Sequence, residues 1–179
     1  MTIARSLDEV EEALSGLARS DLLAIAAVWE GPPRRAEVVG VAVAGEKRSV
    51  YLPVGHRPDP RVNVDSEALA GPVRELLGSS LPKACHDVKA HWHALARIGL
   101  PLDGVVVDTM IAAYLLDPDR GGNPLEAVVL RLTGDSLEPS AWAAGAGAKS
   151  APRELARLSP EEVAHAALPR ARAVLQLAR

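Results

Sequence analysis

The sequence predicts an α/β protein in which helices cover a mixed β-sheet. Three short runs rich in β-branched residues come first, at 21–30, 36–45 and 47–55, and turn residues separate them, as in an antiparallel meander. From residue 65 onwards, short apolar runs alternate with segments of helical spacing, which is typical of parallel strands joined by helices. With 48% hydrophobic and 24% charged residues, the 179-residue chain is expected to form a single domain over 1–179.

The second part of the chain supplies the alternating elements. Strands are expected at 81–85 and 102–107, and helices at 65–78, 87–99, 108–117, 123–134 and 159–179. Asp108 can cap the helix that follows it, and Ser159 with Glu162 forms a capping box at the start of the last helix, which Pro169 could kink. Residues 136–155 lack periodicity and are expected to form a loop. This order of elements is that of ribonuclease-H-like folds.

Composition limits the classes of function. A formal net charge of -3 and a pI near 6.0 give no overall basic field, so we expect weak non-specific affinity for DNA. Because Cys85 is the single cysteine, no internal disulfide can form, which agrees with a reducing compartment. No apolar run is long enough to span a bilayer, so the expected location is cytoplasmic, without a membrane partner.

The segment KACHDVKAHWH has the composition of a metal site. It places Cys85, His86, Asp87, His91 and His93 close together, and cysteine and histidine are suitable zinc ligands. However, His91 and His93 are two residues apart on a predicted helix and point about 200° from each other, because each residue turns the helix by about 100°. Side chains at 85 and 86 alternate between the faces of a strand. We therefore expect no zinc site, with Cys85 in the core and His93 at the surface.

Several segments occur in an order and spacing that match one known domain. They are VGVAVA, YLPVGHR, the long run from LPKACHDVKAHW to DTMIAAYLLDPDR, NPLEAVVLRLTG, and LSPEEVAHAALPRARAVLQL. Over about residues 21–179 the chain resembles the 3′-to-5′ exonuclease domain of bacterial DNA polymerase I. This resemblance implies a ribonuclease-H-like fold and, for active members of the family, two Mg²⁺ or Mn²⁺ ions held by four carboxylates.

The first carboxylate motif of the family, D-x-E on the first strand, is missing from this chain. The resemblance aligns the acidic pair with Ala26 and Val28, or with Ile25 and Ala27 if the register is shifted by one. The nearest acid, Glu30, comes too late on the strand to replace a pair at its centre.

The other two family motifs are also altered. N-x-x-x-D aligns with Asp87 and His91, and Y-x-x-x-D aligns with Ala166 and Arg170. Magnesium prefers oxygen ligands, and a guanidinium would repel it, so we expect these former catalytic positions to bind no Mg²⁺ or Mn²⁺ cofactor. Asp108 is expected to cap a helix and not to bind metal. An ion pair between Asp87 and Arg170 is expected to replace the cohesion that metals would provide.

The resemblance and the altered motifs together predict an inactive proofreading domain that acts as a structural module in DNA replication and repair. Its implied partners are the polymerase and 5′ nuclease domains of a longer chain, with DNA contacted through that parent enzyme. Two alternatives are an active 3′-to-5′ exonuclease with unrecognised ligands, and a free-standing module that binds single-stranded DNA ends.

Overall fold

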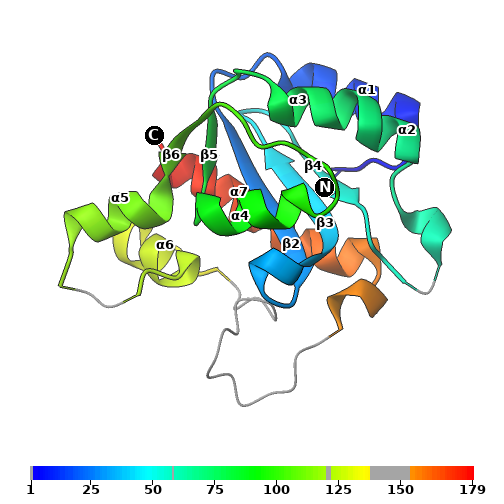
Figure 1. The fold of residues 1–179 in the computed structure, drawn as a ribbon. Helices are drawn as coiled ribbons and strands as arrows, with labels where there is room; N and C mark the ends of the chain where they lie inside the picture. Colours follow the sequence, from blue (N-terminus) through cyan, green and yellow to red (C-terminus); the bar gives the residue numbers. More distant parts are fainter. Residues whose placement is uncertain (1, 58, 120–121, 138–153) are drawn as a thin grey trace.

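A computed structural model describes residues 2–57, 59–119, 122–137 and 154–179. Its described part contains one six-stranded sheet with the order β1-β4-β3-β2-β5-β6 (Figure 1). The strands are β1 (Thr2–Ile3), β2 (Leu23–Glu30), β3 (Glu37–Ala44), β4 (Ser49–Pro53), β5 (Lys83–Cys85) and β6 (Val105–Asp108).

Pairing within the sheet confirms the predicted mixture of directions. Strands β2, β3 and β4 form an antiparallel meander, whereas β5 is parallel to β2 and β6 is parallel to β5. The order β4-β3-β2-β5-β6 is that of a ribonuclease-H-like fold. Strand β1, which was not predicted, pairs parallel with β4 at the outer edge.

Helices cover both faces of the sheet (Figure 1). They are α1 (Leu7–Leu17), α2 (Ser66–Ala68), α3 (Arg74–Gly78), α4 (Val88–Ala96), α5 (Thr109–Leu116), α6 (Leu125–Thr133) and α7 (Pro160–Leu177). Short helical turns lie at Pro33–Arg35, Pro60–Val62, Leu69–Val73 and Leu155–Arg157. None of the helices within the described ranges could cross a bilayer on the criteria of length and apolar character.

Three helix predictions need correction or qualification. Helix α1 was missed, although Ser6 and Glu9 form a capping box at its start. The helix expected over 65–78 is divided by a π-helical turn that contains Pro72, because proline lacks the N–H that a regular α-helix requires there. Helix α7 continues through Pro169. Most of the predicted loop at 136–155 lies outside the described residues.

Strand β2 contributes to both layers of the core because its side chains alternate. Ile25 and Ala27 pack in the cluster under α1, α3 and α4, whereas Ala26 and Val28 pack against α7. The face of α7 towards the sheet carries the small residues Ala164, Ala167 and Ala171, with Val163 and Leu168 beside them. Small side chains let the helix lie close to the strands, so α7 crosses the middle of the sheet beside β2.

A buried polar chain links β4 to the turn before α7. The Nδ1 of His56 lies 2.9 Å from the carbonyl oxygen of Leu158 and therefore donates to it. The Nε2 must then accept from the hydroxyl of Tyr51, 2.9 Å away, when the ring is neutral. Gly40 leaves room for this tyrosine, since a Cβ at position 40 would lie 2.1 Å from the Tyr51 oxygen.

We expect Gly40→Ala to lower the free energy of unfolding by about 1–3 kcal/mol, because the new methyl group would displace Tyr51. Urea denaturation of both proteins measures the difference. Gly71→Ala is the matched control, since no atom outside its own helical turn lies within 4 Å of the added methyl. It should not lower stability, because alanine favours a helix over glycine by about 0.5–1 kcal/mol. Equal effects of the two substitutions would contradict the packing argument.

Candidate functional site

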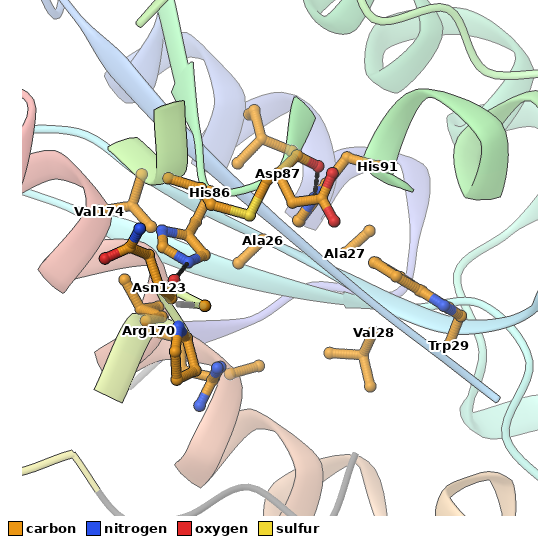
Figure 2. Close-up of a pocket in the computed structure, with 16 residues that line it drawn as sticks. Ala26, Ala27, Val28, Trp29, His86, Asp87, His91, Asn123, Arg170 and Val174 are labelled. Atoms are coloured by element: carbon orange, nitrogen blue, oxygen red, sulfur yellow. Dashed lines mark hydrogen bonds between the residues drawn. The ribbon is translucent and has the colours of Figure 1, made fainter. Parts of the chain in front are cut away.

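A cavity of about 360 Å³ lies between β2, the start of α4, the segment that leads into α6, and α7 (Figure 2). Its lining is mostly apolar, with a few polar side chains among the apolar ones. The lining residues are Ile25, Ala26, Ala27, Val28, Trp29, His86, Asp87, His91, Met110, Gly122, Asn123, Pro124, Leu125, Ala167, Arg170 and Val174.

The alternation of β2 distinguishes the two registers considered for the first motif. Ala26 and Val28 lie on the face of the sheet that carries α7 and Arg170, whereas Ile25 and Ala27 belong to the core on the opposite face. An acidic pair on this strand would meet α7 only at 26 and 28. Both side chains are buried and apolar.

The carboxylate of Asp108 fixes the entrance of α4. It accepts hydrogen bonds from the backbone N–H groups of Asp87 at 3.1 Å and Val88 at 2.8 Å. The same carboxylate caps α5 by accepting from the N–H of Met110 at 2.9 Å, which confirms the predicted cap. Asp108 therefore joins two helix starts, as expected for a structural residue.

Asp87 holds an uncommon backbone conformation at the start of α4. Its φ of 63° and ψ of 68° are left-handed, and among the described residues it alone has a positive φ without being glycine. Aspartate tolerates this conformation better than most residues. Its carboxylate accepts from the N–H of Ala90 at 3.1 Å and so caps the helix.

His86 is clamped between two segments that border the cavity. Its Nε2 lies 2.8 Å from the carbonyl oxygen of Asn123, which requires Nε2 to be the donor. Burial lowers the pKa of His86, so the neutral ring accepts at Nδ1 from the Thr109 hydroxyl, 2.9 Å away. This histidine holds the segment before α6 against β6 and α5.

His91 is buried, and its ring forms an edge-to-face contact with Trp29 at a centroid distance of 5.2 Å. Its Nδ1 donates to the backbone carbonyl of Asp87 at 3.0 Å. Burial lowers the pKa of His91, which favours the uncharged ring. His91 is thus a helix-packing residue at the rim of the cavity.

The predicted partner of Arg170 is wrong. The guanidinium pairs with Glu126 of α6, with 2.5 Å between Nη1 and Oε1, and the two side chains are only 12% and 20% exposed. No hydrogen bond or ion pair within the described ranges joins Arg170 to Asp87. The guanidinium of Arg170 is therefore held by α6, on the α7 side of the cavity.

The remaining candidate residues do not form a metal centre in the part of the chain that the structure describes. No group of three His, Cys, Asp or Glu side chains there is arranged to hold an ion. Cys85 is fully buried, and burial raises the pKa of its thiol to about 12. His93 is half-buried on α4, so its predicted surface position is only partly met. Ala166 lies on α7 but does not line the cavity, whereas its neighbour Ala167 does.

Sequence reasoning missed Trp29, Asn123 and Glu126 as parts of the site. Glu126 in the first turn of α6 had an ordinary explanation as a residue that stabilises the helix start. Asn123 contributes its backbone carbonyl, which any residue could supply. No periodic signal in the sequence connects these positions with α7 or α4.

The strand order and the cleft beside β2 and α7 define the chain as a ribonuclease-H-like, exonuclease-like domain. Solved structures with this fold include Trypanosoma brucei RNase D with GMP, with a TM-score of 0.77, 12% identity, and coverage of 98% of this chain and 55% of that one. Escherichia coli RNase D matches with a TM-score of 0.69 and 12% identity over 99% of this chain and 43% of the other. At these identities the likeness concerns the fold alone.

Residues 27–169 match the family described as "DNA polymerase I, ribonuclease H-like domain", and the chain belongs to this family. DNA polymerase I of Bacillus caldotenax is 34% identical over 118 residues, which are 65% of this chain and 12% of that protein. The Synechocystis sp. enzyme is 32% identical over 99 residues, 51% and 9% of the two lengths. The chain thus corresponds to a small part of these curated relatives.

A solved polymerase structure has the same fold within a longer chain. This is the POL domain of Pol1 from Mycobacterium smegmatis, in complex with DNA primer-template and dNTP, with a TM-score of 0.74 and 23% identity. The match covers 98% of this chain and 26% of that one. Together with the family match, these relatives confirm the predicted resemblance and the predicted fold.

We expect a double-mutant cycle on Glu126→Ala and Arg170→Ala to give a coupling free energy of about 1–3 kcal/mol, because the pair is largely shielded from water. Chemical denaturation of the four proteins measures this coupling. The exposed Arg57–Glu37 pair, with side chains 60% and 67% exposed, is the control and should give about 0–1 kcal/mol. A coupling no larger than that control would contradict a shielded pair.

Stability should fall as the pH is lowered from 8 to 5. Burial lowers the pKa of His56, His86 and His91 in the folded chain, so the unfolded chain binds protons first, near its usual value of about 6.5. The neutral rings make their full contribution to the free energy of unfolding above the pKa of histidine in the unfolded chain. Below that pKa the contribution decreases, by at most about 1.4 kcal/mol per pH unit for each ring. Denaturation midpoints measured across this range test the sign, and His86→Gln should reduce the slope.

Proposed function

We propose that this chain is an exonuclease-like domain of a DNA polymerase I that does not cleave phosphodiester bonds and serves as a structural module. The observation that carries the proposal is the ion pair of Arg170 with Glu126 beside the cavity. It brings a positive charge of the protein to the position where the family resemblance expects a metal-binding aspartate. A guanidinium remains charged and repels divalent cations.

The donor set at the cavity does not fit two divalent cations. Such ions require several oxygen ligands, mainly carboxylates. Among the described side chains that line the cavity, Asp87 is the single carboxylate, and it already accepts the N–H of Ala90. The carboxylate of Glu126 beside the cavity is paired with Arg170. This donor set does not support phosphodiester cleavage by two bound metal ions.

The other aligned positions support the same proposal. Ala26 and Val28 offer no donor atoms towards α7, and Ala166 offers no hydroxyl. His91 uses Nδ1 for a backbone hydrogen bond and packs against Trp29, so its place in the fold is explained by structure alone.

The role in a longer chain is supported by the relatives. They are named DNA polymerase I, and the matched parts are 9% and 12% of the Synechocystis and Bacillus caldotenax proteins. We propose polymerase and 5′ nuclease segments as its partners, with DNA bound through the parent enzyme and only weakly or not at all by this domain alone. A compact fold without catalysis would then support the neighbouring parts of the polymerase.

Incubation of the purified chain with 3′-labelled single-stranded DNA and Mg²⁺ or Mn²⁺ tests the proposal. We expect no metal-dependent release of nucleotides, because the ligands for a two-metal mechanism are replaced. Isothermal titration calorimetry with each cation should detect no binding at the cavity.

The matched control is Asp87→Asn, which keeps a side-chain oxygen to cap α4 but removes the carboxylate charge from the cavity. Release that a mock preparation lacking the chain shows equally would indicate contamination. Release above that background that persists in this variant would indicate an active nuclease with other ligands and would overturn the proposal. Release by the original chain that disappears in the variant would overturn the proposal and favour an active nuclease that uses Asp87.

A further inference from the structure

Helix α5 exposes an apolar surface that nothing in the described part of the chain covers. Ile111, Tyr114 and Leu115 follow the spacing i, i+3, i+4 and share one face of the helix, and Leu116 lies beside them. These four side chains, which we call the α5 patch, are 51% to 73% exposed. An exposed group of large apolar side chains commonly marks an interaction site.

The α5 patch is exposed because α5 packs weakly on its own domain. Of its eight residues, only Thr109 and Ala113 are buried. Figure 1 shows α5 projecting from the end of β6, at the edge of the sheet and beside α6. The helix is nevertheless held at its start by the Asp108 cap, so the patch is presented on an ordered element.

Other large apolar side chains are distributed differently. Both faces of the sheet are covered, by α1, α3 and α4 on one side and by α7 and α6 on the other. Seven of the eight large apolar side chains reported as exposed within the described ranges lie between Val106 and Leu132, and Trp92 on α4 is the exception. The exposed apolar surface is therefore concentrated at the β6 edge.

We infer that the α5 patch docks against the polymerase segment of a DNA polymerase I chain. This inference depends on the proposed function in one respect, namely that the domain works as part of such a chain. In the Mycobacterium smegmatis structure, the fold found here occupies 26% of a chain whose other part is much larger, so an adjoining segment is available to cover an exposed face. Apolar helix faces of this spacing are suited to docking in a groove.

Binding in trans tests the inference with the full 179-residue chain. The probe is the polymerase segment of the source organism's own DNA polymerase I, produced without its ribonuclease-H-like domain. Calorimetry and sedimentation velocity should detect a one-to-one complex. An Ile111→Ser, Leu115→Ser double variant should weaken it at least about tenfold, because apolar anchors in the centre of an interface carry most of its binding energy.

Trp92→Ser is the matched control, since Trp92 is 54% exposed but lies on α4, away from the α5 patch. It should leave the affinity unchanged within about twofold, and each variant should keep the circular dichroism and melting behaviour of the original chain, as expected for exposed positions. Absence of a complex, or equal weakening by the control, would overturn the inference.

Self-association is the competing outcome. If the chain alone forms dimers that the double variant abolishes, a second copy is the occupant and the inference is wrong. The nuclease assay is independent of these measurements: docking can fail while the chain is inactive, and nucleotide release can occur while docking is intact.

Discussion

The carboxylate of Asp108 is the interaction on which the arrangement around the cavity depends. It belongs to the last residue of β6 and accepts hydrogen bonds from N–H groups at the starts of both α4 and α5, so one charged group sets where two helices leave two neighbouring parallel strands. The positive, N-terminal end of each helix dipole also points at this negative charge. Through α4 it fixes Asp87 and His91 at the cavity, and through α5 it fixes the direction of a helix that has little other packing.

Local chemistry accounts for the parts of the fold that could be predicted. The meander, the cap at Asp108 and the capping box of Ser159 with Glu162 all follow from contacts within a few residues. Helix α1, which was not predicted, carries the same kind of local signal, since Ser6 and Glu9 form a capping box at its start. The break near Pro72 also had a visible cause in the sequence.

The cavity was less predictable because its contacts join distant parts of the chain. Position 170 was identified, but its partner, 44 residues earlier in the sequence, is set by the way α6 packs beside α7. The first family motif could align with positions 26 and 28 or with positions 25 and 27, and only the three-dimensional structure distinguishes them. Alternation along a strand assigns side chains to two opposite faces but does not tell which face packs against α7. Periodicity along one element cannot supply a contact between two elements.

The buried thiol of Cys85 gives the protein a built-in reporter of opening. Only the thiolate reacts readily with alkylating reagents, and this sulfur is both inaccessible and held in its protonated form. Since Cys85 projects from β5 into the cluster under α1, α3 and α4, a reagent reaches it only when this helical layer moves away from the sheet. As the chain has no other cysteine, the rate of alkylation measures how often this layer of the core opens, without any engineered label.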